Sequence, residues 1–295
     1  MKNCTEIVKT GNKILLPHST SPQLDAELLL GYVLQKDRAW LLAHPDHTLQ
    51  GQALQKYNNL LSRRVAGESI AYITGAKEFY GRQFIVNKHV LVPRPESESF
   101  IELLRQLKDN NVNPFLQGRT LLQGQALQSG EANHIGGFLH SILDMGTGSG
   151  CLGITSALEF TDTFVTATDT STTALKVAIQ NAKKYDTSIV FKKQSLLTGD
   201  KQGYDVILAN LPYVPAAMQD ASIQHEPKQA LFSGIDGLNH YRRLFKQLAP
   251  KHIRFVMTES LLTQHESVAE LAKKAGYTPT LTDGLVQLFA KTAHL

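Results

Sequence analysis

Strand-like and helix-like segments alternate through the second half of this chain, and this alternation constrains the fold more than any other feature. Short apolar runs with the character of strands lie at 138–145, 163–169, 189–195, 205–210 and 253–259. Helical segments separate most of them, which predicts an α/β fold with a parallel sheet and right-handed crossovers. Ligands of such sheets bind beyond the carboxyl ends of the strands, and polar residues stand at the ends of these runs.

The first third of the chain has a different pattern. Residues 21–72 are predicted to be helical, because a Ser-Pro start signal is followed by apolar residues at helical spacing. Residues 73–95 change to the alternation of a β-hairpin, which two prolines close. We therefore expect a helical domain at 1–72, a hairpin linker at 73–95 and the sheet domain at 96–295.

Two further segments belong to the expected sheet domain. Residues 96–108 are predicted to form a helix with its apolar residues on one face. Residues 109–137 are rich in Gln, Asn and Gly, and we expect a mobile surface insert there.

The composition excludes several classes of protein. The 295 residues are 42% apolar and 19% charged, as in ordinary globular proteins. No apolar run reaches the roughly 18 residues that cross a bilayer, and the N-terminus lacks the apolar core of a secretion signal. Cys4 and Cys151 fit no metal-ligand spacing, and so few cysteines favour a reducing compartment. We expect a cytoplasmic protein without a metal or a membrane partner.

The net charge of +4 is concentrated near the N-terminus. Residues 1–90 hold 11 Lys and Arg against 7 Asp and Glu, and the charges balance in the remainder. An acidic partner and a solvated helical surface explain this surplus equally well. It is small for a protein with many phosphate contacts, so direct binding to nucleic acid is not expected.

A glycine-rich loop follows the first strand of the predicted sheet. "LDMGTGSGCLG" places glycines at 146, 148, 150 and 153 between a strand and a helix, where the backbone can pass close to a ligand. The spacing also satisfies the dinucleotide-binding pattern, and tight-turn glycines without a ligand are the alternative.

Two carboxylates distinguish between the nucleotide ligands. Asp144 precedes the loop, where a carboxylate suits the cationic ammonium of S-adenosylmethionine (AdoMet) and would repel the pyrophosphate of NAD. Asp169 ends the second strand, where it can accept ribose hydroxyls or act as a helix cap before Ser171. Leu196 and Leu197 end the third strand, where they suit either an adenine ring or the core.

An amide, a proline and an aromatic ring follow the fourth strand in "DVILANLPYVP". A planar NH₂ group is a poor nucleophile because its lone pair is delocalised, so alkylation requires its N–H groups to be held by acceptors. The Asn210 side chain and the Leu211 carbonyl can supply two acceptors. Pro212 restricts the backbone, and Tyr213 offers a flat stacking face. The segment predicts a site that works by orientation.

These motifs, taken in order, resemble the release factor glutamine methyltransferases, a family also called HemK or PrmC. Family-like segments include "DAELLLGYVLQKDRAWLLAHPD", "RRVAGESIAYITGAKEFYGRQFIVNKHVLVPRPESE" and "EPKQALFSGIDGLNHYRRL". The resemblance implies methyl transfer from AdoMet to the glutamine amide of the Gly-Gly-Gln motif in class-1 peptide chain release factors. It also implies a Rossmann-like, seven-stranded class I methyltransferase domain, and an N-terminal helical domain that contacts the release factor. We expect a monomer.

Carried over by position, the resemblance assigns roles to individual residues. The acceptor glutamine would bind at Asn210, Leu211, Pro212 and Tyr213, with Asn210 also near the cofactor. Leu197 stands where the family has an aromatic residue near adenine. AdoMet would contact the loop and its flanking carboxylates, which are Asp144, Gly146, Thr147, Gly148, Ser149, Gly150 and Asp169.

The sequence departs from the family pattern in places. Leu211 replaces the first proline of the usual Asn-Pro-Pro-Tyr, and Ser97 replaces a threonine. Asn-Leu-Pro-Tyr is also the motif of ribosomal RNA adenine dimethyltransferases, which remain the alternative, although that family places its helical domain after the catalytic fold. A nucleotide-binding assembly protein without activity is a third reading, which the intact Asn210 and Tyr213 disfavour.

Overall fold

The computed structural model describes residues 2–109, 139–218, 223–251 and 253–292. The chain divides into two compact units, which are described separately below. The first comprises Met1–Lys77, Val86–Lys88 and Gln219–Glu226, and the second Glu78–Ile85, His89–Met218 and Pro227–Leu295. The domain boundaries expected from the sequence remain predictions. Apart from Asp109, the expected insert at 109–137 lies outside the described residues.

The first unit is helical. Its elements are β1 (Lys2–Asn3), α1 (Cys4–Leu15), α2 (Pro22–Leu34), α3 (Arg38–Ala43), β2 (Thr48–Leu49), α4 (Gly51–Val65) and α5 (Ile70–Thr74). The predicted start at Ser21-Pro22 is confirmed, because α2 begins there with Pro22 in its first turn. Helix α1 was missed by the sequence analysis, although Asn3 and Glu6 form a capping box at its start.

The predicted β-hairpin is present as β3 (Ala76–Phe79) and β4 (Arg82–Ile85). Its two turn residues, Tyr80 and Gly81, have positive φ angles of 52° and 71°. This is the two-residue turn that matches the twist of paired strands. The side chains of Phe79 and Phe84 meet edge to face, with ring centroids 6.2 Å apart, and are buried in the core of the second unit.

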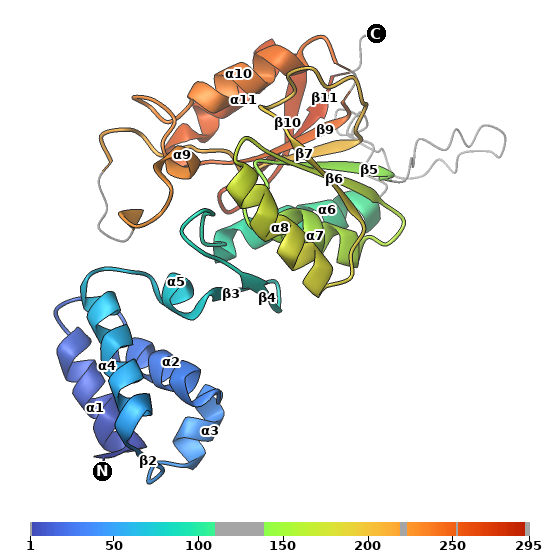
Figure 1. Ribbon diagram of the computed structural model, residues 1–295. Helices are drawn as coiled ribbons and strands as arrows, with labels where there is room; N and C mark the ends of the chain where they lie inside the picture. The colour runs from blue at the N-terminus through green and yellow to red at the C-terminus, as the bar shows by residue number, and fades with distance from the viewer. Residues whose placement is uncertain (1, 110–138, 219–222, 252, 293–295) are drawn as a thin grey trace, which may run out of the picture. The chain divides into compact units, whose positions relative to one another are not determined.

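The second unit is built on a seven-stranded mixed sheet, which confirms the predicted Rossmann-like fold (Figure 1). Strands β5 to β9 are parallel, and β11 runs antiparallel to both β9 and β10. The spatial order is β10-β11-β9-β8-β5-β6-β7. Their bounds are β5 (Ser141–Met145), β6 (Phe164–Asp169), β7 (Ile189–Lys193), β8 (Val206–Ala209), β9 (Phe255–Glu259), β10 (Tyr277–Asp283) and β11 (Val286–Lys291).

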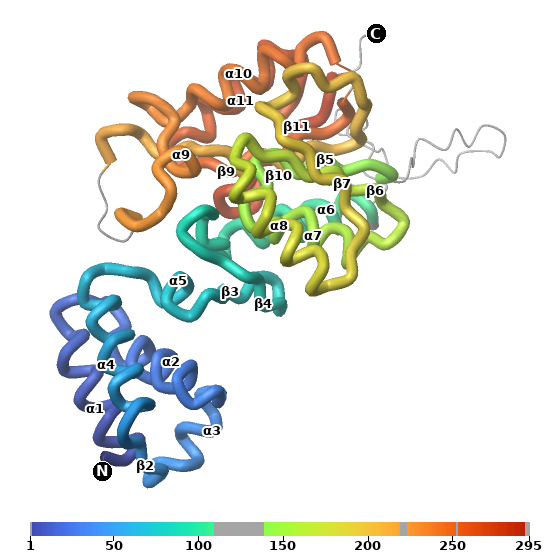
Figure 2. Tube along the Cα trace, viewed as in Figure 1, coloured from blue at the N-terminus to red at the C-terminus, as the bar shows by residue number. Residues whose placement is uncertain are grey.

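Helices cover both faces of this sheet, and Figure 2 shows the path of the chain between them. One face carries α6 (Ser99–Asp109), α7 (Cys151–Glu159) and α8 (Thr172–Lys184); the other carries α10 (Asn239–Leu248) and α11 (His265–Lys274). Shorter helices are η1 (Pro95–Glu98), α9 (Lys228–Leu231) and η3 (Leu262–Gln264). Alternate residues of a strand enter opposite cores: Val206 and Leu208 pack on one face, Ile207 and Ala209 on the other.

The register of the central strands sets out the carboxyl edge of the sheet. Met145 of β5 lies beside Thr168 of β6 and Ala209 of β8, and Ala209 lies beside Thr258 of β9. The residues that follow these four are therefore neighbours: Asp169, Gly146, Asn210 and Glu259, in that order across the sheet. Every one of them is polar or glycine, although the strands themselves are mostly apolar.

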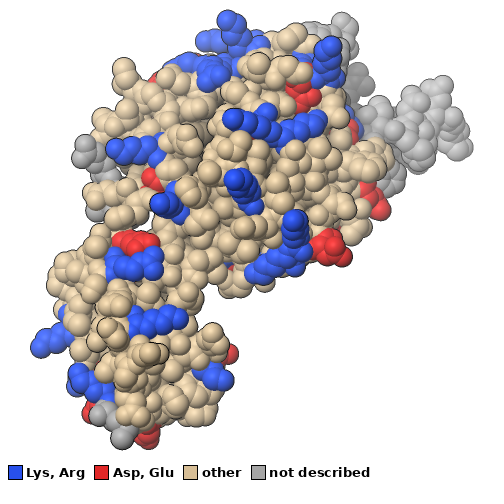
Figure 3. Space-filling model, viewed as in Figure 1, with Lys and Arg blue, Asp and Glu red and all other residues tan. Residues whose placement is uncertain are grey.

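The helices of the described residues fall short of what crossing a membrane requires, and the charges on one face of the molecule are shown in Figure 3. No helix within the described ranges combines the length and apolar character that crossing a bilayer requires. In Figure 3, Lys and Arg side chains on the visible face of the second unit are scattered and separated by uncharged surface.

Candidate active site

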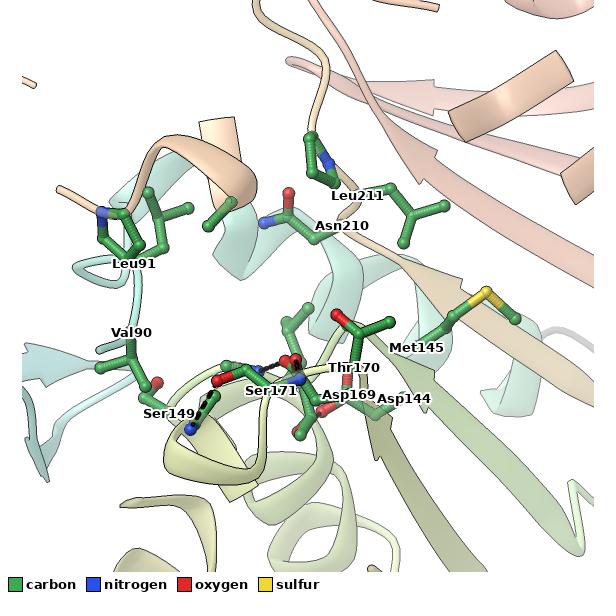
Figure 4. Close-up of a pocket in the computed structure, with 18 of the residues that line it drawn as sticks. Val90, Leu91, Asp144, Met145, Ser149, Asp169, Thr170, Ser171, Asn210 and Leu211 are labelled. Atoms are coloured by element: carbon green, nitrogen blue, oxygen red, sulfur yellow. Dashed lines mark hydrogen bonds between the residues drawn. The ribbon is translucent and has the colours of Figure 1, made fainter. Parts of the chain in front are cut away.

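The polar residues at the carboxyl edge of the sheet open into one pocket. Most of the residues predicted from the sequence line it together: Asp144, Gly146, Thr147, Gly148, Ser149, Asp169, Asn210, Leu211 and Pro212. A second wall comes from the segment before η1 and includes Val90, Leu91 and Arg94. In Figure 4, Asn210 and Leu211 lie on one side of this pocket, with Asp169, Thr170 and Ser171 below them. Gly150, Leu197 and Tyr213 are not among its lining residues in the described chain.

The loop between β5 and α7 is held by backbone hydrogen bonds to the neighbouring strand. The amides of Gly146 and Thr147 both donate to the Thr168 carbonyl oxygen, at 2.8 and 2.9 Å. Asn181 of α8 donates from Nδ2 to the Ser149 carbonyl at 2.8 Å. The loop is therefore a fixed part of the sheet edge, and its shape is set by the main chain.

Gly150 has a packing role within this loop. It precedes α7 with φ of 83°, a conformation that favours glycine. A Cβ atom at this position would lie 2.9 Å from Cδ1 of Ile154 and 3.1 Å from Cβ of Ala178. Gly150 thus allows α7 and α8 to approach the loop, which explains its place behind the pocket wall.

Asp144 is a buried carboxylate beneath the loop, with 1% of its surface exposed. Its Oδ2 atom accepts hydrogen bonds from the Thr147 hydroxyl at 2.5 Å and the Gly153 amide at 2.9 Å. Burial raises the pKa of this carboxyl to about 6, and those two hydrogen bonds oppose the shift. None of the ion pairs found in the described residues includes Asp144. A cationic group in the pocket would find an uncompensated negative charge.

Asp169 connects the loop to the start of α8. Its Oδ2 accepts from the Gly148 amide at 3.0 Å, and its Oδ1 accepts from the Ser171 amide at 2.8 Å (Figure 4). Burial raises the pKa of this carboxyl as well. The helix cap itself is Ser171, whose hydroxyl accepts from the Ala174 amide at 3.2 Å. Each carboxylate oxygen retains acceptor capacity toward the pocket.

The end of the third parallel strand corrects one prediction. Leu197, expected near an adenine ring, is buried in the core on the α10 side, and its amide donates to Oε1 of Gln247 at 2.8 Å. Leu196 lines the pocket instead. Its φ of 50° turns the chain after the strand, so the alternation of side chains that held along the strand no longer applies here.

The Asn210 amide is bound on its nitrogen side. Nδ2 donates to the Ser97 hydroxyl oxygen at 2.9 Å and to Oε2 of Glu259 at 3.2 Å. Among the described residues no donor reaches the amide oxygen, Oδ1. The next residue, Leu211, is buried, and its Cδ2 would lie 3.3 Å from a Cβ at Gly146. The segment after β8 is therefore packed against the glycine loop.

Tyr213, predicted to offer a flat stacking face, is anchored at the end of β9. Its hydroxyl donates to Oε1 of Glu259 at 2.8 Å, and Gln264 donates to its carbonyl oxygen at 2.9 Å. Burial and the Glu259 carboxylate raise the pKa of the Tyr213 hydroxyl. Tyr213 is not among the lining residues of this pocket in the described structure, and its stacking role stays a prediction. The hydrogen bond to the end of β9 holds it in place.

Glu259 is the site residue that the sequence analysis did not identify. It is 1% exposed at the end of β9, and it accepts hydrogen bonds from Ser97, Asn210 and Tyr213. Burial raises the pKa of its carboxyl, against the lowering effect of the Ser97 and Tyr213 hydrogen bonds. The available signal was positional: the fifth strand-like run ends in an acidic residue at the same edge as the other site residues.

Tyr241 of α10 links the two strands that carry Asn210 and Glu259. It is fully buried, and its hydroxyl contacts the carbonyl oxygens of Ala209, at the end of β8, and of Glu259, at the end of β9. One hydroxyl thus bridges the ends of neighbouring strands immediately behind the site.

Two family models match the chain. Residues 6–75 match the PrmC N-terminal domain, and residues 129–230 match the methyltransferase small domain.

Proteins of known name match over most of the chain. A release factor glutamine methyltransferase of Koribacter versatilis is 36% identical over 77% of this chain and 74% of its own length. A bifunctional methyltransferase of Rickettsia felis is 34% identical over 91% of this chain, which spans 53% of that longer protein. The chain is thus about half the length of the Rickettsia relative. Among solved structures, the hMettl16 catalytic domain, in complex with MAT2A 3'UTR hairpin 1, aligns with a TM-score of 0.53 at 14% identity, over 90% of this chain and 91% of that one. This last likeness concerns the fold alone.

Proposed function

Because this chain belongs to the release factor glutamine methyltransferase family, we propose that it methylates a glutamine side-chain amide of a peptide chain release factor. The methyl donor would be AdoMet, and the acceptor would be the glutamine of the Gly-Gly-Gln motif in class-1 release factors. The alternatives weighed from the sequence, an RNA adenine methyltransferase and an inactive nucleotide-binding protein, are outcomes of the test below.

The pocket suits AdoMet in its charge and in the groups that line it. Asp144 is buried without an ion-pair partner among the described residues, so the ligand's ammonium would compensate its charge. Asp169 is placed to accept ribose hydroxyls while it holds the Gly148 amide. Leu196 lines the pocket and would flank the adenine ring, the role that the sequence suggested for Leu197. Bound AdoMet would supply a methyl group on a positively charged sulfur.

The acceptor side of the pocket suits a primary amide. The Oδ1 atom of Asn210 accepts from no donor of the described residues, so it is available to one N–H of the substrate glutamine. The carbonyl of Leu211 would accept the other N–H, and Pro212 restricts the direction of that carbonyl. Two acceptors in this arrangement orient the nitrogen lone pair toward the donor, and the enzyme then acts mainly by orientation.

Leu211 is compatible with this role despite replacing the usual proline. The proposed acceptor is a backbone carbonyl, which every residue has. The leucine side chain is 5% exposed and packs in the core on the α10 side. Packing therefore restrains the backbone at this position, where the family has the first proline of its Asn-Pro-Pro-Tyr motif.

The single observation that carries the proposal is the convergence of two kinds of group in one pocket. The glycine loop with Asp144 and Asp169 faces the same space as Asn210, Leu211 and Pro212. A cofactor-binding half and an amide-binding half are thus adjacent. The first unit, which matches the PrmC N-terminal model, is proposed to recognise the release factor.

The test is methyl transfer to defined acceptors. The full chain would be incubated with methyl-labelled AdoMet and a purified class-1 release factor, and mass spectrometry would locate the added methyl. The matched control is the same release factor with its Gly-Gly-Gln glutamine replaced by alanine. We expect label on the glutamine of the unmodified factor and none on the control.

A parallel incubation with small-subunit ribosomal RNA distinguishes the alternatives. Methyl label on adenines of the RNA, with none on the release factor, would overturn the proposal in favour of the RNA methyltransferase. AdoMet binding without transfer to either acceptor would favour the inactive binding protein.

A further inference from the structure

We propose that Glu259 and Ser97 are positioning residues that determine whether the Asn210 side chain presents its oxygen or its NH₂ group to the substrate. The inference rests on the proposed function, since it assigns the cause of the acceptor geometry used there. Ser97 lines the pocket and Glu259 does not, and both are proposed to act through their hydrogen bonds with Asn210 rather than on the reacting atoms.

A count of protons fixes the orientation of the amide. The Ser97 hydroxyl donates its one proton to Oε2 of Glu259 at 2.6 Å, so its oxygen can only accept from Asn210. The Ser97 and Tyr213 hydroxyls each donate to one oxygen of Glu259, an arrangement that suits the ionised carboxylate, so Oε2 can also only accept. Both neighbours of the amide are therefore acceptors, and the group facing them must be the NH₂. The oxygen Oδ1 is left for the substrate.

The opposite orientation would defeat the site. If the amide were reversed, its NH₂ would meet the NH₂ of the substrate glutamine, and two donors would face each other. Its oxygen would then face Oε2 of Glu259, and Ser97 could donate to that oxygen only by withdrawing its proton from the carboxylate. An unpaired buried polar atom of this kind costs about as much as a lost hydrogen bond, and more beside a charge. The pair therefore excludes the reversed amide by repulsion and favours the productive one by attraction.

The location of the carboxylate supports a positioning role. Glu259 is 1% exposed, and no Lys or Arg salt bridge to it is found among the described residues, although the charge of Arg94 opposes the rise that burial gives the pKa of its carboxyl. Burying a carboxylate costs stability unless hydrogen bonds compensate, and its three donors all belong to the site or flank it. An apolar side chain would fill this core position at less cost if packing were its sole purpose.

Four variants separate acceptor geometry from charge and volume. Glu259→Leu fills the space but removes both oxygens, and we expect kcat to fall about 100-fold, as misoriented reacting groups typically cause. Glu259→Gln keeps one oxygen for Ser97 and Asn210 and turns its NH₂ to the Tyr213 oxygen, so a smaller fall of roughly 10-fold is expected. Ser97→Ala should also lose roughly 10-fold. Ser97→Thr, which keeps the hydroxyl, should recover most of that loss.

The matched control is Asp205→Asn, a carboxylate-to-amide change at the opposite end of the same sheet. Asp205 accepts from the amides of His140 and Ser141 and lies outside the pocket. It should leave kcat unchanged. For all variants, AdoMet affinity measured by calorimetry should stay within about 3-fold of the wild type, because Asp144 and Asp169 are untouched, so the effect should lie in kcat. Melting temperatures identify any variant that fails to fold.

A second readout does not depend on the acceptor. The side-chain NH₂ protons of Asn210, assigned from their loss in Asn210→Ala, should exchange with solvent more than 10-fold more slowly than those of the exposed Asn58. In Glu259→Leu this protection should disappear.

The outcomes are distinct. If the wild type does not methylate a release factor, the proposed function fails. The exchange of the Asn210 NH₂ protons then tests by itself whether Glu259 and Ser97 hold the amide. If the wild type is active and a folded Glu259→Leu keeps more than half of its kcat, the positioning role is wrong. Loss of kcat in Ser97→Thr equal to that in Ser97→Ala would likewise overturn it.

Discussion

The loop after β5 and the segment after β8 both follow a buried parallel strand and face the same pocket, yet they are held in place by different means. The β5 loop is shaped by its own backbone: positive φ angles at Gly146, Gly148 and Gly150, and amides bonded to the next strand. The β8 segment depends on side chains from elsewhere, because Asn210 is bound by Ser97 and Glu259.

The loop after β5 and the segment after β8 should therefore tolerate substitutions differently. A main-chain site depends on a few glycines and is insensitive to the identity of many neighbours. A side-chain site depends on partners 113 and 49 positions away in the sequence, each of which must be present and in the right protonation state. Changes to the glycines of the β5 loop should therefore act through stability, and changes to the β8 segment or its partners through chemistry.

The largest effect is expected from a substitution in the segment after β8 that leaves the β5 loop unchanged. Asn210→Ala removes the proposed amide acceptor, and we expect turnover to fall at least about 1000-fold, in the range seen when one preorganised hydrogen-bonding group is lost. AdoMet affinity, measured by calorimetry, should stay within a few-fold, because the glycine loop and both carboxylates remain. Near-normal turnover in this variant would refute the amide-clamp mechanism.

A smaller effect is expected when the cofactor half is strained. Gly150→Ala places a Cβ 2.9 Å from Cδ1 of Ile154 at a left-handed φ, and the free energy of unfolding should fall by about 2–3 kcal/mol. The matched control is Gly199→Ala, which has φ of 73° but no described atom beyond its chain neighbours within 4 Å. It should cost only about 1 kcal/mol. Chemical denaturation measures both, and equal losses would contradict the packing role of Gly150.

The smallest expected effect is a dependence of AdoMet affinity on pH. The pKa of Asp144 is raised to about 6 by burial, and a cationic ligand beside it would favour the ionised form. AdoMet affinity should therefore be full above that pKa and fall as pH decreases through it, by up to about 10-fold per pH unit. Calorimetry between pH 5 and 8 measures this fall.

The control for the pH experiment is Asp144→Asn. It should bind more weakly than the wild type at pH 8 and show a shallower pH dependence, since the remaining slope belongs to other groups such as Asp169, whose pKa is also raised. A wild-type affinity that is constant from pH 5 to 8 would exclude Asp144 as the partner of the ammonium.

The sequence predicted the cofactor half better than the acceptor half, and for a physical reason. Strand alternation, glycine spacing and the carboxylates at strand ends are local patterns, so Asp144, the loop and Asp169 could be located from them. The contacts of Asn210 follow from strand register and from the return of η1 to the sheet, which no local pattern encodes. Glu259 and the hydrogen bond of Tyr213 therefore emerged from the structure.

Two further differences have equally specific causes. Leu196 replaces Leu197 at the pocket because one residue with left-handed backbone geometry reverses the order of side chains after β7. Helix α1 escaped prediction, although the Asn3 and Glu6 capping box was legible in the sequence. The position of Leu196 depends on a backbone turn that no local sequence pattern encodes. The start of α1, in contrast, is encoded locally by the capping box.

The bridge made by Tyr241 makes the site depend on α10, a helix that covers one face of the sheet and reaches the pocket at His240. The tyrosine hydroxyl spans the carbonyl oxygens of Ala209 and Glu259, so the gap between the two strand tips is governed from the opposite layer of the domain. Small shifts of α10 would be transmitted as a change in spacing between the amide and its carboxylate anchor. The Tyr241 hydroxyl thus fixes the spacing of the two strand ends, and substitutions on the α10 face of the sheet would alter the geometry of the Asn210 site.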